Sequence, residues 1–204
     1  MAEVAAIVLA AGRSTRFAGG AVGATKLVAE VDGVPLVRHA VEAAVGSGAT
    51  PVVLVTGHAR DQVLRATAGL ATLDAYNPDF ASGIASSVRT GLAALPATSA
   101  AALVLLGDMP RVTATLARKL IAAFGQDPSL DAVAPIVEGR RGNPVLISRR
   151  LFADAMRLEG DEGARRLLMR QDLRVAEVSV DDAGAALDVD TPEALQSLAT
   201  SRSR

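Results

Sequence analysis

Short apolar runs alternate with amphipathic segments along most of this chain, and this alternation limits the fold more than any other feature of the sequence. Fully apolar runs occupy residues 5–9, 52–55 and 101–106, and each ends in a loop of small or polar residues. Such runs are typical of strands buried on both faces of a sheet. The segments between them have helical periodicity, as over 35–45 and 113–124. We therefore expect an α/β fold of the Rossmann-like three-layer type, with a mostly parallel sheet and a mixed edge.

The same pattern predicts a single domain. No linker-like composition and no internal repeat interrupts residues 1–200, and the polar residues 201–204 are expected to form a disordered tail. The weaker periodic segments predict further strands at 73–76, 132–137, 144–147 and 175–180, and further helices at 61–68, 84–95, 149–158, 162–169 and 191–198.

Composition excludes several classes of function. The formal net charge is -1, so bulk binding to nucleic acid or to a membrane surface is not favoured. The chain has no cysteine, which excludes disulfides, thiolate catalysis and cysteine-ligated metals. No apolar run reaches the roughly 18 residues that a membrane span needs, and no basic segment precedes the first run. We expect a cytoplasmic protein.

The loop after the first apolar run is the strongest functional signal. Open α/β sheets bind ligands at the carboxyl ends of their strands. Small residues there let a ligand approach the main chain, and arginine guanidinium groups suit phosphate oxygens. The loop lacks the glycine spacing of dinucleotide-binding and P-loop proteins. The loop therefore predicts a different kind of polyphosphate site. The alternative is an ordinary turn with solvated arginines. The residues of the predicted site are Leu9, Ala10, Ala11, Gly12, Arg13, Ser14, Arg16 and, further on, Lys26.

Two acidic motifs are candidate metal sites, because Mg²⁺ prefers carboxylate and phosphate oxygens. Asp108 follows the run 101–106 and belongs to the carboxyl end of the sheet. Asp188 and Asp190 share one face if their segment is extended. The alternative for Asp108 is a turn or helix cap before Pro110. For Asp188 and Asp190 the alternative is capping of the helix predicted at 191–198.

Other polar segments are candidates for contacts with substrates. Gly57 ends the second apolar run, and Asn77, Ser86 and Ser87 flank the start of the helix predicted at 84–95. Hydroxyls in such a place can contact a base or ribose, but helix capping is the more frequent role of a serine there. A basic turn contains Arg141, Gly142 and Asn143, and a later Gly-Asp pair contains Asp161. This turn suits a phosphorylated second substrate, with a solvated turn as the alternative.

These motifs resemble a known superfamily. LAAGRSTRF followed by a lysine is similar to the signature loop of nucleotidyltransferases that activate small molecules with an NTP. RRGNP at 140–144 and GDEGAR at 160–165 resemble elements of the molybdenum cofactor cytidylyltransferases, so the resemblance spans nearly the whole chain. Ala11 is typical of the cytidylyl branch, whereas Met109 is more typical of the guanylyl branch.

The resemblance implies a nucleotidyltransferase fold and a set of roles for individual residues. Catalytic roles fall to Arg16, Lys26 and Asp108, and metal binding to Asp108 and Asp190 with Asp188 as a helper. Nucleotide contacts fall to the first loop, Gly57, Asn77, Ser86, Ser87 and Asp108. Contacts with the second substrate fall to Arg141, Gly142, Asn143 and Asp161.

The implied reaction is a Mg²⁺-dependent transfer of CMP from CTP to molybdopterin, with release of pyrophosphate. A molybdoenzyme or its chaperone would be a further partner. One alternative within the superfamily uses GTP or another small phosphorylated acceptor. An alternative of a different class is a non-catalytic nucleotide-binding regulatory module.

Overall fold

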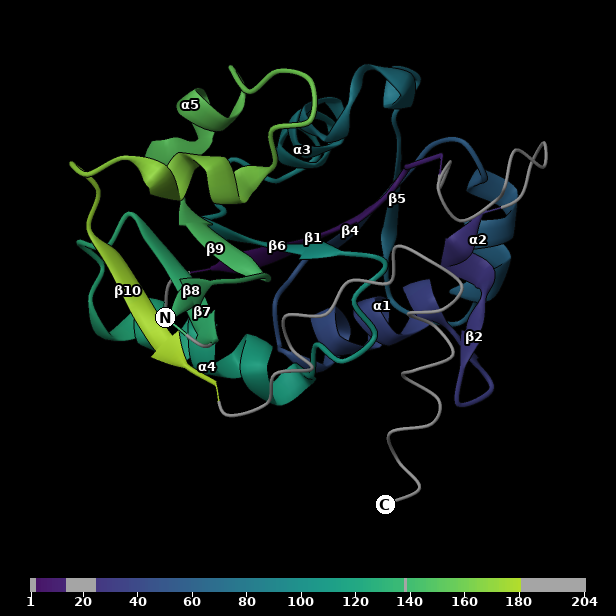
Figure 1. Cartoon of the computed structure of the whole chain (residues 1–204), viewed down its shortest axis with the longest axis horizontal. Helices are drawn as coiled ribbons and strands as arrows, with labels where there is room; N and C mark the ends of the chain where they lie inside the picture. The colour runs from purple at the N-terminus through teal and green to yellow at the C-terminus, as the bar shows by residue number, and fades with distance from the viewer. Residues whose placement is uncertain (1–2, 14–24, 138, 181–204) are drawn as a thin grey trace.

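The computed structural model describes residues 3–13, 25–137 and 139–180 (Figure 1). Ser14, Arg16, Asp188 and Asp190 lie outside the described residues, as do the predicted helix 191–198 and the predicted tail. The described residues form one eight-stranded sheet in the order β10-β7-β9-β6-β1-β4-β5, with β8 paired to β7. Its strands are β1 (Val4–Ala10), β4 (Val52–Thr56), β5 (Leu73–Tyr76), β6 (Ala101–Leu106), β7 (Ala132–Val137), β8 (Arg140–Arg141), β9 (Val145–Ser148) and β10 (Val175–Ser179).

Most of the sheet is parallel, which confirms the predicted fold class. β1 pairs in parallel with both β4 and β6, and β10 pairs in parallel with β7. β9 runs antiparallel between β6 and β7, so one antiparallel strand lies inside the sheet, and β8 also pairs antiparallel with β7. The connection from β7 to β9 is too short for a helical crossover, and a short connection can join only antiparallel neighbours.

Helices cover both faces of this sheet (Figure 1). Alternate residues of β1 face opposite sides, so that Ala6 and Val8 belong to one core and Ile7 and Leu9 to the other. The first core is covered by α1 (Leu36–Gly46), α2 (Arg60–Ala66) and α4 (Ala114–Gln126). The second is covered by α3 (Ile84–Ala93), α5 (Phe152–Ala155) and the 3-10 helix η4 (Ala164–Met169). Every residue of β1 is buried, as expected for a strand between two layers.

Local features of the sequence account for one turn and one helix start. The turn at Asp32 and Gly33, both with positive φ, joins β2 (Glu30–Val31) to β3 (Val34–Pro35). Positive φ at both positions matches the right-handed twist of a two-residue hairpin. The hydroxyl of Thr113 accepts a hydrogen bond from the N–H of Leu116 and caps α4. None of the helices in the described part of the chain has the length and apolar character that a membrane span requires.

The two helices predicted at 149–158 and 162–169 are shorter than expected and partly of another type. The first is a 3-10 turn, η3 (Arg149–Leu151), followed by the single-turn α5, and the second is the 3-10 helix η4. Tertiary contacts explain the difference, since Gly160 between them gives its carbonyl to the N–H of Ala85 on α3. Apolar periodicity cannot register such a contact.

Candidate active site

The carboxyl ends of β1, β4 and β6 bring three loops together. In the parallel register Leu9 lies opposite Leu106, and Ala10 lies opposite Thr56. The loop after β6 bonds to the end of β1, where the N–H of Gly107 donates to the carbonyl of Leu9 at 3.0 Å. The predicted polyphosphate loop therefore begins at the centre of the sheet, between the two loops that follow β4 and β6.

Gly57 is required for the close approach of two of these loops. A Cβ at Gly57 would lie 2.7 Å from both the Cβ and the carbonyl oxygen of Ala11. The side chain of Ala11 is buried, and its carbonyl accepts a hydrogen bond from the N–H of His58 at 3.2 Å. Glycine is thus required at position 57 because there is no space for a side chain, and not because of the backbone conformation. The methyl group of Ala11 serves this packing, and the nucleotide contact implied for Ala11 stays a prediction.

Lys26 and Asp108, far apart in the sequence, form an ion pair at the same edge of the sheet. The Nζ of Lys26 lies 2.7 Å from the Oδ2 of Asp108, and the side chains are 12% and 19% exposed. Lys26 opens the 3-10 helix η1 (Lys26–Val28), where the hydroxyl of Thr25 accepts a hydrogen bond from the N–H of Leu27. Water screens such a pair less than one on the surface. Two of the three residues predicted for catalysis, Lys26 and Asp108, are therefore held together at this edge of the sheet.

The surroundings of Asp108 fit a divalent metal. Its carboxylate already has a cationic group at contact distance, the ammonium of Lys26, so the position favours positive charge. Within the described ranges, no three His, Cys, Asp or Glu side chains gather into a metal-binding group. Mg²⁺ typically takes one or two carboxylates and completes its shell with substrate phosphates and water. Of the carboxylates predicted to hold the metal, the described part of the chain contains Asp108, and its role as a ligand stays a prediction.

Asn77, Ser86 and Ser87 form a buried polar cluster. The amide nitrogen of Asn77 donates to the hydroxyls of Ser86 at 2.9 Å and of Ser87 at 3.0 Å. All three side chains are buried. Gly83 occupies the N-cap of α3 without a side-chain bond, so the capping interpretation of the serines is wrong. Their hydroxyls instead fix the segment between β5 and α3, because buried amide and hydroxyl groups need partners.

Phe80 was missed by sequence reasoning. It lies on the 3-10 turn η2 (Phe80–Ser82), with its ring centroid 5.7 Å from the guanidinium carbon of Arg13 and 5.8 Å from the His58 ring. This cation–π contact joins the loop after β1 to the loop after β5. An aromatic residue in an otherwise polar loop, in a chain with few aromatic residues, was the available signal.

A cavity of about 430 Å³ opens beside the carboxyl ends of β1 and β6, on the α3 and η4 side of the sheet. The strands and α3 form its apolar wall. The residues just before η4 and those of η4 itself form its charged rim. Asn143 and Asp161, both predicted to bind the second substrate, line it. The other lining residues are Leu9, Ile84, Val104, Leu106, Glu162, Gly163, Ala164, Arg165, Arg166 and Met169.

Arg141 and Gly142 do not line this cavity. The guanidinium of Arg141 donates to the Oε1 of Glu177 on β10 at 2.7 Å and to the carbonyl of Leu168 on η4 at 2.6 Å. Gly142 donates its N–H to the carbonyl of Pro135. These bonds tie β8 to its neighbours and place Asn143 at the cavity. Direct contact of Arg141 or Gly142 with a ligand stays a prediction.

Comparisons with known proteins agree with this geometry. Residues 6–175 match the family model of the MobA-like NTP transferase domain. The bifunctional protein GlmU of Pelobacter propionicus is 33% identical over 158 residues, which cover 78% of this chain and 33% of that protein. The chain therefore spans about a third of the length of that relative. The molybdenum cofactor cytidylyltransferase of Escherichia coli K12 is 29% identical over 144 residues, or 70% of each chain.

A solved structure extends the likeness over the whole fold. The crystal structure of Rv0371c from Mycobacterium tuberculosis H37Rv superposes with a TM-score of 0.84 at 27% identity, covering 97% of this chain and 98% of that one. A structure of Rv0371c in complex with manganese gives a TM-score of 0.79 at 26% identity, covering 98% and 99%.

Proposed function

Because this chain belongs to the MobA-like NTP transferase domain family and is a nucleotidyltransferase, we propose that it transfers CMP from CTP to the phosphate of molybdopterin. The observation that carries the proposal is the Lys26–Asp108 pair at the carboxyl ends of β1 and β6, because residues at the ends of the same two strands, Leu9 and Leu106, line a cavity large enough for a second substrate. The likeness to a molybdenum cofactor cytidylyltransferase over 70% of both chains supports this choice of acceptor.

In the proposed complex the triphosphate of CTP lies along the loop after β1. The main chain from Leu9 to Gly12 approaches it closely, and Arg13, Arg16 and Lys26 neutralise its charge. Ser14 is a further phosphate contact. The base lies toward Ala11 and Gly57, and the buried Asn77, Ser86 and Ser87 cluster shapes the loop beside it.

The proposed reaction is an in-line displacement. An oxygen of the acceptor phosphate forms a bond to the α-phosphorus of CTP, and the bond from that phosphorus to the bridging oxygen of the β-phosphate breaks. Pyrophosphate leaves with the electron pair. The attacking phosphate is already ionised, so no strong general base is required. Catalysis then consists of alignment and neutralisation of charge, in which Lys26 acts on the polyphosphate.

A divalent metal, proposed to be Mg²⁺, would be held by Asp108 with Asp190 and Asp188. When bound, it neutralises charge on the phosphates. Lys26 must then exchange at least part of its contact with Asp108 for contact with the nucleotide, because both cations compete for one carboxylate. The structure of Rv0371c with manganese supports a divalent ion in this family.

The acceptor is proposed to lie in the cavity. Asn143 and Asp161 would bind its polar groups, and the bonds of Arg141 on β8 and of the adjacent Gly142 would position Asn143. The apolar wall of Ile84 and Leu106 suits a ring system. The relative GlmU favours another small phosphorylated acceptor as the second candidate, and Met109 favours GTP as the second candidate nucleotide.

Steady-state kinetics test the proposal. Purified chain, Mg²⁺ and molybdopterin would be combined with each of the four NTPs, and pyrophosphate release would be followed. We expect CTP to give the highest kcat/KM. Preference for GTP would overturn the choice of base and leave the reaction class standing. Absence of pyrophosphate with every NTP would overturn the proposal.

A further inference from the structure

The segment 158–163, which carries Asp161 to the cavity, is bonded directly to α3. The carbonyl of Gly160 accepts a hydrogen bond from the N–H of Ala85 at 3.0 Å. The guanidinium of Arg89 donates to the carbonyl of Leu158. Gly83 and Gly160 are in backbone contact, since a Cβ at Gly83 would lie 2.1 Å from the carbonyl oxygen of Gly160. We name residues 158–163 the acceptor segment.

The same end of α3 is bonded to the segment 77–83. The cluster of Asn77, Ser86 and Ser87 links the end of β5 to α3. The hydroxyl of Ser86 also lies 2.8 Å from the carbonyl of Gly83 and 3.0 Å from that of Asp79. We name residues 77–87 the nucleotide segment. The beginning of α3 is therefore shared by both segments through short polar contacts.

α3 itself is seated tightly on the sheet. A Cβ at Gly91 would lie 2.5 Å from the Cγ2 of Ile7 on β1 and 3.1 Å from the Cγ2 of Val55 on β4. Close-packed contacts of this kind transmit a displacement and do not absorb it. A ligand that orders the beginning of α3 must therefore act on both bonded segments.

We propose that α3 couples the two substrate sites, with Arg89 as a positioning residue for the acceptor segment. A nucleotide bound beside residues 77–87 orders the first turn of α3, and the bonds of Ala85 and Arg89 carry this order to Asp161 at the cavity. Acceptor then binds to a segment that is already ordered, and the coupling is reciprocal. The inference rests on the proposed function, because it assumes nucleotide at one segment and acceptor at the other.

Amide hydrogen exchange tests the coupling without any acceptor. The full chain would be compared with and without CTP and Mg²⁺. In the wild type, CTP should slow exchange in both the nucleotide segment and the acceptor segment. In Arg89→Gln, CTP should still slow the nucleotide segment, with the slowing of the acceptor segment reduced or lost. Arg89→Lys keeps one donor for Leu158 and should restore part of the effect.

Arg118→Gln is the matched control. Arg118 likewise donates to a backbone carbonyl, that of Gly46, but from α4 on the other side of the sheet. This variant should respond to CTP as the wild type does. In turnover assays Arg89→Gln should raise the KM for molybdopterin by about three- to tenfold, the effect of one lost hydrogen bond. Its Kd for CTP measured without acceptor should stay within about twofold of the wild-type value, because the coupling acts only when both substrates bind.

The outcomes separate the inference from the proposed function. If CTP slows exchange at 77–87 of the wild type and leaves 158–163 unchanged, the coupling is overturned and the proposed function stands. If CTP binds nowhere, both are overturned. The wild-type measurement decides the question even if Arg89→Gln does not fold.

Discussion

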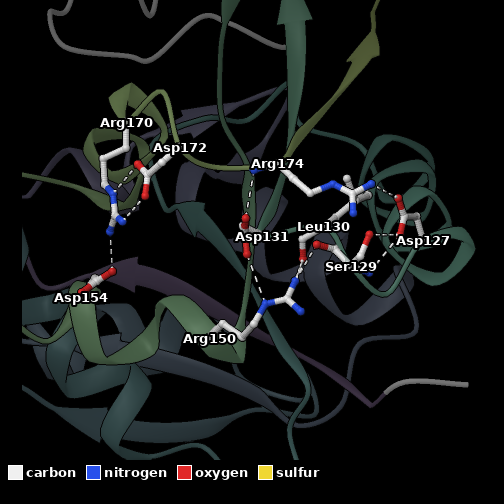
Figure 2. A network of polar contacts seen from close by, with 9 residues as sticks. All are labelled: Asp127, Ser129, Leu130, Asp131, Arg150, Asp154, Arg170, Asp172 and Arg174. Carbon is white, nitrogen blue, oxygen red and sulfur yellow. Dashed lines mark hydrogen bonds and ion pairs between the residues drawn. The ribbon is translucent and has the colours of Figure 1, made fainter.

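The two ends of the central sheet use charge in different ways. At the carboxyl ends of β1 and β6, Lys26 and Asp108 form a largely buried pair. At the opposite end, where β7 and β10 begin, Asp127, Asp131, Arg150 and Arg174 form a network that we name the amino-end network (Figure 2).

The amino-end network ties chain segments together near the surface. The carboxylate of Asp131 accepts hydrogen bonds from the N–H of Arg174 at 2.9 Å and from the Nε of Arg150 at 3.1 Å. Arg150 also donates to two backbone carbonyls, and Arg174 donates to Asp127. The arginine side chains of these pairs are 55% and 62% exposed. Water and salt screen such pairs, so each contributes little to stability.

The comparison of the two ends separates charges that stabilise the fold from charges that are placed for a reaction. At the amino end, exposed ion pairs join the start of β7 to the start of β10, and each arginine in these pairs has more than one partner. The pair at the other end is shielded from water, where electrostatic interactions are stronger. Substitutions at the two ends should therefore separate stability from turnover.

Asp108→Asn should give the largest effect. The amide keeps the shape of the side chain and removes its charge, so turnover should fall by about a hundredfold or more, as for other losses of transition-state charge stabilisation. Asp131→Asn at the amino end should leave turnover within about twofold of the wild-type value. Pyrophosphate release would be measured for both variants, with circular dichroism as the check on folding. Near-normal activity of Asp108→Asn would remove Asp108 from the metal site.

Lys26→Met should change two affinities in opposite directions. Loss of the ammonium should weaken CTP binding by about tenfold, the scale of one charge-assisted hydrogen bond. Without nucleotide, Mn²⁺ should bind roughly fivefold more tightly, because no cation competes for Asp108. Isothermal titration calorimetry measures both affinities. Lys119→Met on α4, which replaces the chain's other lysine, is the control. Unchanged Mn²⁺ affinity in Lys26→Met would show that the two cations do not compete.

Gly57→Ala should destabilise the fold at the carboxyl end. The added Cβ meets Ala11 at 2.7 Å, so the free energy of unfolding should fall by about 1–3 kcal/mol, as for other overpacked sites. Gly125→Ala on α4, where a Cβ meets nothing within 4 Å, should instead raise it by about 0.5–1 kcal/mol. Urea unfolding measures the free energy of unfolding of both variants. Equal stability of the two variants would show that the loops after β1 and β4 separate easily.

Asp127→Asn at the amino end should have the smallest effect. The hydroxyl and N–H of Ser129, and then Arg174, hold the pKa of Asp127 below its usual value of 3.8. Its carboxylate therefore stabilises the fold above about pH 3.8, and this stabilisation is lost as the pH falls through the lower pKa of the folded state. The small difference in Tm between wild type and variant should be present at pH 6 and shrink on acidification below 3.8. A difference that grows on acidification would contradict this sign.

The core of the fold could be predicted from the sequence, because fully apolar runs identify β1, β4 and β6 whatever surrounds them. The inner position of β9 and the 3-10 form of η4 could not, because contacts between distant segments decide both. Asp108 could be assigned to the carboxyl edge from the strand before it. Its pairing with Lys26 depends on the path of the chain from β1 to η1, which periodicity does not encode.

The residues that line the cavity are likewise divided into those that the sequence predicts and those that it does not. Asn143 and Asp161 were found by their resemblance to family elements. Ile84, Arg165 and Met169 were missed, because they reach the cavity only through the packing of α3 and η4. The serines at 86 and 87 were predicted to contact the nucleotide, with capping of α3 as the alternative, whereas in the structure the amide of a buried asparagine donates to both hydroxyls. A pattern of single residues cannot distinguish these roles.

Transfer of a labelled phosphate tests the central claim most directly. The chain would be incubated with Mg²⁺, molybdopterin and CTP labelled with ³²P at either the α- or the γ-phosphate. Nucleotidyl transfer predicts that the α-label moves to the acceptor and that the γ-label appears in pyrophosphate. Movement of the γ-label to the acceptor, or no movement of either label, would contradict nucleotidyl transfer by this site.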